Sequence, residues 1–170
     1  VSGSVDAARD ARLMVMVGAD ESTIEPVRAV LAAMGREILC LGAVGAGATM
    51  KLAINMLIHG LNQTLAESLA LSGAAGISPD VAYRAIEGSA AAAPMVQYRK
   101  QLYLDEAANP VSFALALARK DVTLAMELAT ELGVSMPQTE LNLEQLRAAE
   151  EAGYGERDMA SMVDYVRGAR

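Results

Sequence analysis

The pair of residues best suited to chemistry is Lys51 and Asn55, which lie four residues apart in a predicted helix after a glycine-rich turn. Residues at i and i+4 project from one helical face, so an ammonium and an amide share a direction near the positive end of the helix. Such a pair suits an oxygen atom that gains negative charge. The same face can also be the solvated side of an amphipathic helix, and the spacing fits both interpretations.

His59 and Asn62 extend this polar line toward the C-terminal end of the helix. A single His on a helix is more typical of packing or of the surface than of a general base. One Cys and one His in the whole sequence are too few for a zinc site, so we expect no metal.

The charged pair Lys120-Asp121 interrupts the apolar stripe of another predicted helix. Burying such a pair is unfavourable unless both charges find partners. The pair is therefore either satisfied within a helix contact or directed into a cleft.

The glycines that precede Lys51 do not form a familiar nucleotide-binding loop. Gly42, Gly45 and Gly47 follow the order G-x-x-G-x-G, which differs from the dinucleotide fingerprint G-x-G-x-x-G. The segment is not a Walker loop either, because no Gly directly precedes Lys51 and no Ser or Thr follows it.

The elements before this turn predict a small α/β unit. An apolar run at 13–17 and a second at 38–41 read as buried strands, and Ser22 and Glu25 fit a capping box for a helix between them. One β-α-β unit cannot bury both sheet faces. Either another chain supplies further sheet or a preceding domain has been removed.

The sequence after residue 43 predicts helices alone. We expect a domain at 1–43, and an all-helical domain at 44–170 that includes a long helix connecting the two. The chain is therefore expected to be mainly α. The helices are predicted from apolar spacing and from glycine and proline stops, at about 47–72, 79–87, 94–104, 113–132, 139–152 and 158–167.

The composition limits the possible partners. A net charge of −7 and the lack of a Lys/Arg patch argue against nucleic acid. Lys, Asn, Gln or Glu interrupt every apolar stretch well before 18 residues, so we expect no membrane span. The single cysteine, Cys40, is predicted to be a buried thiol of a reduced compartment, which favours the cytoplasm.

Several segments resemble, in the same order, motifs of the β-hydroxyacid dehydrogenases, which include 3-hydroxyisobutyrate dehydrogenase and tartronate semialdehyde reductase. The resemblance covers nearly the whole chain and corresponds to about the C-terminal two-thirds of that family. It implies that residues 1–43 are the end of a Rossmann-type nucleotide-binding domain whose main part is absent. The segments are 1–4, 13–18, 42–55, 113–125 with Lys120-Asp121, 133–139 and 153–158.

The resemblance implies a role for each candidate residue. Lys51 would be the general acid that protonates a carbonyl oxygen as hydride reaches its carbon, and the base in the reverse direction. Asn55 would hold the substrate or the lysine. The substrate carboxylate would lie at Ser2, Gly3 and Ser4.

Lys120 would reach the NAD or NADP cofactor, and Asp121 would orient the Lys120 side chain. The resemblance does not distinguish NAD from NADP, because the residue that contacts the cofactor ribose would lie outside this chain.

Two departures from the family pattern affect the substrate. Ser4 stands where many members have a second Gly, and Ile54 stands where many have a first Asn of an Asn-Asn pair. Ile54-Asn55-Met56 also differs from the His-Asn-Gly of the relative that decarboxylates 6-phosphogluconate. A small, unphosphorylated 3-hydroxy acid and its semialdehyde are therefore the expected substrates.

The expected protein is an NAD(P)-dependent dehydrogenase, present as a fragment that is inactive or nearly so, and a homodimer through its helical domain. Two alternatives stay open. One is a non-catalytic helical dimerisation module derived from this fold. The other is an imine reductase-like enzyme, although such relatives usually lack a lysine at the position of Lys51.

Overall fold

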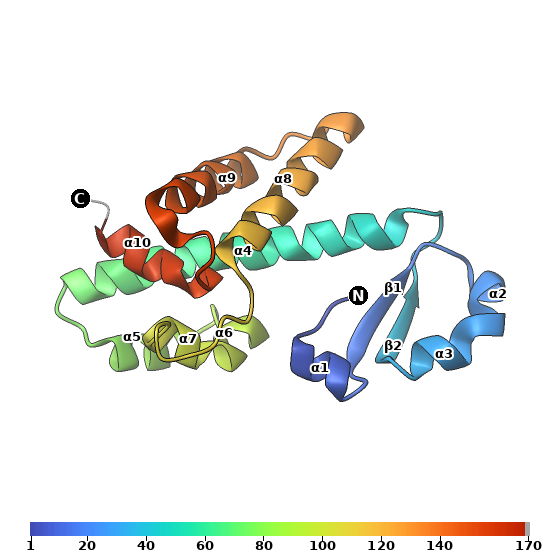
Figure 1. Ribbon diagram of the computed structural model, residues 1–170, viewed down its shortest axis with the longest axis horizontal. Helices are drawn as coiled ribbons and strands as arrows, with labels where there is room; N and C mark the ends of the chain where they lie inside the picture. The colour runs from blue at the N-terminus through green and yellow to red at the C-terminus, as the bar shows by residue number, and fades with distance from the viewer. Residues whose placement is uncertain (169–170) are drawn as a thin grey trace. The chain divides into compact units, whose positions relative to one another are not determined.

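The computed structural model describes residues 1–168, which form two compact units (Figure 1). The first unit runs from Val1 to Asn55 and the second begins at Met56. The fold is mainly helical, with one two-stranded parallel sheet in the first unit. This confirms the predicted fold class.

The first unit is built around strands β1 (Leu13–Val17) and β2 (Gly35–Cys40). They pair in parallel, with Val15 opposite Ile38. Because parallel neighbours need a crossover, the chain between them forms three short helical pieces, and α3 packs against β2. The pieces are α2 (Glu21–Ile24), η1 (Glu25–Val27) and α3 (Arg28–Ala32), and a further short helix, α1 (Val5–Arg9), precedes β1.

The start of the crossover differs from the predicted capping box. Asp20, not Ser22, is the N-cap, and its Oδ1 accepts hydrogen bonds from the Thr23 backbone N at 2.8 Å and the Ser22 hydroxyl at 2.9 Å. A carboxylate is a strong acceptor at a positive helix end. The bonds from Thr23 and Ser22 lower the pKa of Asp20 below its usual value.

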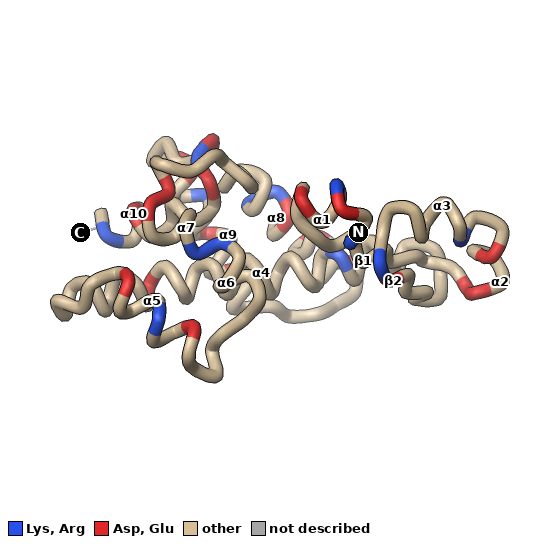
Figure 2. The backbone as a smooth tube through the Cα atoms, turned by 90° about the horizontal axis from the view of Figure 1, so that it is seen from below, with Lys and Arg blue, Asp and Glu red and all other residues tan. Residues whose placement is uncertain are grey.

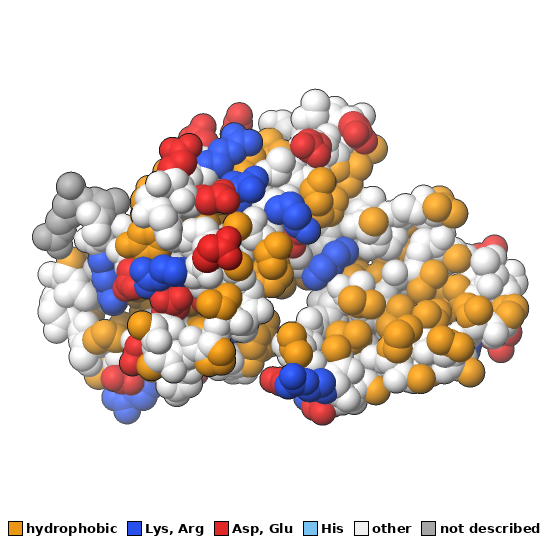
Figure 3. Space-filling view, viewed as in Figure 1, with side chains coloured by type: hydrophobic (Ala, Val, Ile, Leu, Met, Phe, Trp, Pro, Cys, Tyr) orange, Lys and Arg blue, Asp and Glu red, His pale blue; other side chains and the backbone are white. Residues whose placement is uncertain are grey.

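The sheet of the first unit is only partly covered. Val15 and Met16 are buried, whereas most other strand residues are half-buried or exposed. Cys40 is half-buried and not the core thiol expected from its apolar neighbours, because two strands offer too little sheet to enclose it. Figure 3 shows hydrophobic side chains gathered over the face of this unit.

The second unit is helical throughout its described part. Helix α4 (Ala46–Ala74) begins in the first unit and continues into the second as one 29-residue helix. The predicted helix over 94–104 is two short helices with a break at Arg99. The remaining elements are α5 (Pro79–Glu87), α6 (Pro94–Tyr98), α7 (Lys100–Leu104), α8 (Leu115–Leu132), α9 (Pro137–Ala149), the π-helical turn η2 (Glu150–Tyr154), η3 (Met159–Ser161) and α10 (Met162–Gly168).

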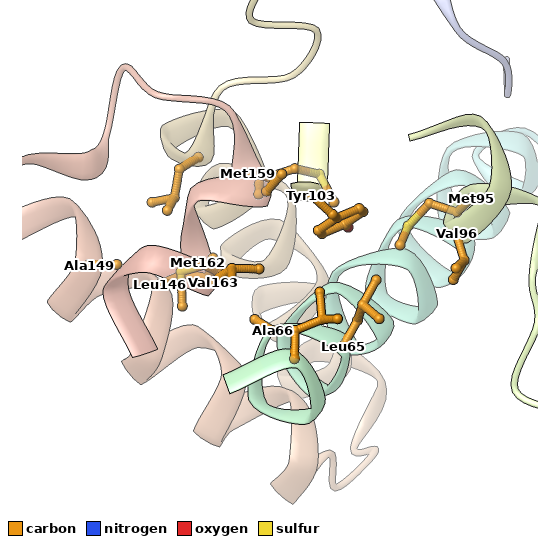
Figure 4. Packing of buried hydrophobic residues seen from close by; sticks show 14 of the residues in the cluster. Leu65, Ala66, Met95, Val96, Tyr103, Leu146, Ala149, Met159, Met162 and Val163 are labelled. Atoms are coloured by element: carbon orange, nitrogen blue, oxygen red, sulfur yellow. The ribbon is translucent and has the colours of Figure 1, made fainter. Parts of the chain in front are cut away.

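One hydrophobic core joins these helices. In Figure 4, Leu65 and Ala66 of α4 lie close to Met95, Val96 and Tyr103 of the short helices and to Met162 and Val163 of α10. Each fully buried large side chain stabilises the fold by about 1.5–3 kcal/mol. This core holds the part of α4 that lies in the second unit. Fully buried members include Tyr83, Val96, Leu115, Val122, Leu146, Met159 and Met162.

The described surface carries charges of both signs. Figure 2 shows Lys and Arg interspersed with Asp and Glu along the chain. None of the helices within residues 1–168 combines the length and the apolar character needed to cross a membrane.

Candidate active site

The glycine-rich turn sets the start of α4 and thereby the position of Lys51. Gly42 and Gly45 have φ angles of +87° and +94°, in the left-handed region that glycine adopts without strain. Gly47 serves another purpose, because a Cβ there would lie 2.5 Å from the carbonyl oxygen of Met16 in β1. The turn therefore brings the first turn of α4 against the end of β1.

Lys51 and Asn55 meet on α4 as the helical spacing predicts. Lys51 Nζ donates a hydrogen bond to Asn55 Oδ1 over 2.8 Å. Lys51 is half-buried and Asn55 is 5% exposed. The arrangement fixes a cation beside a polar amide on one helical face, which is the donor set suited to an oxygen that becomes an alkoxide.

The segment predicted to hold a carboxylate lies at the start of the first unit. The Ser2 backbone exchanges two hydrogen bonds of 2.9 Å with Met14, which ties the segment to β1. Gly3 has φ +144°, and a Cβ there would lie 2.7 Å from Leu13 Cδ2. The Ser4 hydroxyl accepts a hydrogen bond from the Ala7 backbone N at 3.2 Å as the N-cap of α1, a role that the sequence analysis missed.

Lys120 and Asp121 form a second charged group, in α8 of the second unit. Lys120 Nζ lies 3.0 Å from Asp121 Oδ1, and the two side chains are 56% and 13% exposed. Asp121 Oδ2 lies 4.0 Å from Nε2 of His59, which is buried in α4. The pair thus combines a solvent-accessible cation with a carboxylate that is held among helices.

A network around Asp158 fixes the segment that leads into α8. The Asp158 side chain is fully buried and pairs with the guanidinium of Arg99. Its Oδ2 accepts hydrogen bonds from the backbone N atoms of Ser112 and Phe113, at 2.9 and 3.1 Å. Oδ1 accepts one from the Ala160 backbone N at 2.9 Å.

Asp158 is also the N-cap of η3, so the same carboxylate joins this helical turn to Arg99 and to the segment before α8. Nothing local in the sequence identifies Arg99 as the partner, because 59 positions separate the two residues.

Asn62 belongs to the core and not to a solvated face. Its amide donates to the Met159 carbonyl at 3.0 Å and accepts from the Tyr103 hydroxyl at 2.6 Å. Burial raises the pKa of Tyr103, which keeps the phenol protonated as a donor. The polar line that begins at Lys51 therefore ends in a buried structural network.

The described residues offer no cluster for a metal ion. No group of three or more His, Cys, Asp or Glu side chains within 1–168 is placed to hold one.

Two protein-family models together match nearly the whole chain. Residues 45–166 match the model described as NAD-binding of NADP-dependent 3-hydroxyisobutyrate dehydrogenase. Residues 1–42 match the NAD binding domain of 6-phosphogluconate dehydrogenase.

Curated relatives agree with these matches. Glyoxylate/succinic semialdehyde reductase 1 of Arabidopsis thaliana is 30% identical over 170 residues, which is 100% of this chain and 58% of that protein. The 2-hydroxy-3-oxopropionate reductase of Escherichia coli is 30% identical over 164 residues, which is 96% of this chain and 56% of that protein. The chain thus spans less than two-thirds of the length of these relatives.

Solved structures share the fold. The 3-hydroxyisobutyrate dehydrogenase of Mycobacterium tuberculosis, solved with L-serine, superposes with a TM-score of 0.86 at 29% identity, over 98% of this chain and 59% of that chain. The enzyme of the same name from Salmonella typhimurium also gives 0.86, at 28% identity, over 96% of this chain and 57% of that chain. The family model that matches most of the chain, together with these relatives, shows that the chain belongs to the β-hydroxyacid dehydrogenase family, whose cofactor is NAD or NADP.

Proposed function

We propose that this chain carries the catalytic lysine of an NAD(P)-dependent oxidoreductase that interconverts a small 3-hydroxy acid and its semialdehyde or oxo acid. Family membership supports the reaction class. The observation that carries the proposal for this chain is the Lys51–Asn55 pair, with 2.8 Å between Nζ and Oδ1.

Lys51 is the proposed acid and base. In reduction, its Nζ–H gives a proton to the carbonyl oxygen while hydride arrives at the carbon, and the resulting hydroxyl leaves Lys51 as a neutral amine. In oxidation, the neutral amine takes the hydroxyl proton as hydride leaves. General acid–base catalysis of this kind contributes about 10²–10⁴-fold to a rate.

Asn55 supports this role through its hydrogen bond. The bond to Oδ1 restrains the flexible lysine side chain, so the ammonium is held before the substrate arrives. Asn55 is also the proposed contact for the substrate, as the resemblance to the family implies.

The substrate carboxylate is proposed to lie at Ser2, Gly3 and Ser4. Their support is the fixed backbone, because two hydrogen bonds tie Ser2 to Met14 and Gly3 packs tightly against Leu13. Ser4 still carries an O–H donor while its oxygen caps α1.

Lys120 and Asp121 are proposed to serve the cofactor. When bound, the nicotinamide supplies or accepts the hydride. The residues fit such a group because the Lys120 ammonium is accessible to solvent and Asp121 restrains it at 3.0 Å. A restrained cation is suited to an amide or phosphate oxygen.

The substrate is proposed to be small and unphosphorylated. The relatives named glyoxylate/succinic semialdehyde reductase and 2-hydroxy-3-oxopropionate reductase act, by their names, on small aldehyde and oxo acids.

The 170 residues alone are proposed to be inactive or nearly so, because the G-x-G-x-x-G fingerprint is absent from them. A homodimer through the helical unit is the proposed assembly. Its support is apolar surface on α4, where Leu57 is 67% exposed and lines two shallow surface hollows. A cytoplasmic location stays a prediction.

Two other functions fit these residues less well. A non-catalytic dimerisation module explains the apolar helices but gives no reason for a half-buried lysine beside an amide. An imine reductase-like enzyme is disfavoured by Lys51, since relatives of that kind usually lack a lysine there.

The test is a rate assay on the complete gene product with a panel of small 3-hydroxy acids and either NAD or NADP. We expect oxidation of at least one member and a loss of activity in Lys51→Ala. Lys100→Ala is the matched control, because Lys100 pairs with Glu87 and lies over the ring of Tyr83, and neither of these residues belongs to the proposed site. Absence of hydride transfer with every substrate and both cofactors would overturn the proposal in favour of the dimerisation module.

A further inference from the structure

His59 is a buried polar residue whose place in the structure packing alone does not explain. It lies in α4, four residues beyond Asn55, and is 3% exposed. Within residues 1–168, neither ring nitrogen has a hydrogen-bond partner in this structure. A buried polar atom without a partner costs about 1–3 kcal/mol, so such an imidazole calls for a specific partner.

Two side chains enclose the imidazole of His59 within the second unit. The ring of Phe113 lies at 5.7 Å between centroids, tilted by 31°. The Asp121 carboxylate faces the ring, with 4.0 Å between its Oδ2 and His59 Nε2. The buried Asp158 fixes the backbone of Phe113, so one wall of this pocket is held in place.

The Asp121 carboxylate favours a proton on Nε2 of His59 over one on Nδ1. A neutral imidazole has one N–H donor and one acceptor nitrogen. A lone pair on Nε2 would face an anionic oxygen and be repelled, whereas an Nε2–H would be attracted. A movement of about 1 Å closes the 4.0 Å separation to an ordinary charge-assisted hydrogen bond.

We propose that His59 is a positioning residue that donates its Nε2–H to Asp121 Oδ2. Asp121 Oδ1 already faces the Lys120 ammonium at 3.0 Å. The carboxylate would thus be held from two sides, by an imidazole from α4 and by its neighbour in α8. Through Asp121, His59 would set where the Lys120 ammonium points.

The consequence for the reaction rests on the proposed function, in which Lys120 and Asp121 serve the cofactor. Loss of the His59 donor would then weaken cofactor binding without changing the proton transfer proposed for Lys51. The hydrogen bond itself does not depend on that function, and the two parts can be tested separately.

The hydrogen bond can be tested on the 170-residue chain by nitrogen NMR of the imidazole. His59 is the one histidine in this sequence, so 15N-histidine labelling gives a single pair of ring signals. We expect the Nε2–H tautomer in the natural sequence and a mixture of tautomers in Asp121→Ala. A dominant Nδ1–H tautomer in the natural sequence, or an unchanged spectrum in a folded Asp121→Ala, would overturn the proposal.

The positioning role can be tested by cofactor affinity in the complete gene product. His59→Phe keeps an aromatic ring against Phe113 but removes the donor, and His59→Gln keeps an N–H at about the place of Nε2. We expect NAD or NADP to bind about tenfold more weakly to His59→Phe and within about threefold of normal to His59→Gln. Normal binding by His59→Phe, or equal weakening in both variants, would contradict the role.

These measurements also distinguish a failure of the proposed function from a failure of the His59–Asp121 hydrogen bond. If the natural protein binds neither NAD nor NADP, the proposed function fails, and with it the positioning of Lys120 for a cofactor. The tautomer measurement would still decide whether His59 donates to Asp121.

Discussion

At the scale of single residues, the pairing of Lys51 with a neutral amide distinguishes this site from an ordinary surface ion pair. An amide oxygen orients the ammonium over 2.8 Å without adding a negative charge that would hold the proton strongly. In the proposed mechanism, Lys51 releases a proton to a substrate oxygen and takes it back in the reverse direction. Replacing the amide by a carboxylate should change this balance.

We predict that Asn55→Asp moves the pH profile of the oxidation rate to more alkaline pH. A carboxylate beside Lys51 stabilises the ammonium form, so a higher pH is needed to form the neutral amine that acts as base. The measurement is the rate of hydroxy acid oxidation between about pH 6 and 11, a range chosen to span the usual lysine value. An unchanged profile in an active variant would show that Lys51 is not the titrating base.

We predict that Asp158→Asn lowers the free energy of unfolding by about 3–5 kcal/mol, because it leaves the buried guanidinium of Arg99 without its counter-charge. Asp164→Asn is the matched control, since the Arg157–Asp164 pair is 36% and 49% exposed and should contribute less than about 1 kcal/mol. Urea unfolding at pH 7 measures both. Similar losses in the two variants would contradict the assigned role of Asp158.

The sequence predicted which side chains share the face of α4 but not what covers them. Helical spacing brings Lys51 to Asn55 as expected, because that relation lies within one helix. The same spacing could not show that Asn62 meets Tyr103 and Met159, at separations of 41 and 97 positions. Those contacts depend on how distant helices pack, which a local pattern does not contain.

At the scale of elements, two glycines of α4 provide a test of how the helix is placed. Gly47 packs against the Met16 carbonyl oxygen, whereas a Cβ at Gly60 would meet nothing within 4 Å. The same substitution should therefore have opposite effects at the two positions.

We predict that Gly47→Ala destabilises the protein by about 1–3 kcal/mol, because the added methyl group forces α4 away from β1. Gly60→Ala should be neutral or stabilise by up to about 1 kcal/mol, since alanine is the better helix former. Urea denaturation followed by circular dichroism compares them. The explanation fails if Gly47→Ala is as stable as Gly60→Ala.

Element ends were harder to predict than elements. The strands, the long helix and the stop at Gly133, which has φ +69°, follow from apolar runs and from glycine. Asp20 is the N-cap of α2 instead of the predicted Ser22, because both are good capping residues and they lie within three positions of each other. The break at Arg99 was not predicted, and Arg99 pairs there with Asp158, which is 59 positions away.

At the scale of the whole molecule, the two units differ in how much core they contain. The first has a two-stranded sheet with few buried side chains, among them Val15, Met16 and Ile24. The second has one continuous core across its helices. Two-stranded sheets are marginal without further cover, whereas a helical core of this size supports cooperative unfolding.

We predict that hydrogen exchange in the 170-residue chain is faster in β1 and β2 than in α8 and α9. The strand amides should open at lower free energy, because less apolar surface is exposed when they separate. Exchange followed by mass spectrometry on peptides from each unit measures this. Equal protection of the strands and the two core helices would show that the first unit is stabilised by contacts beyond its own sheet.

The fold class followed from the sequence because its signals are regional: apolar runs before residue 43 and helical spacing after it. How much of the β1–β2 sheet is buried, and whether subunits associate, could not be predicted from these regional signals. Both depend on contacts between surfaces that are distant in the sequence or lie on different chains.

The central claim is that Lys51 transfers the proton, and chemical rescue tests it most directly. In the complete gene product, Lys51→Ala should lose about 10²–10⁴-fold in rate. Added primary amines should restore part of that rate in proportion to their concentration, because a free amine can occupy the space of the missing side chain. The claim would be contradicted if Lys51→Ala oxidised its hydroxy acid at the rate of the natural protein.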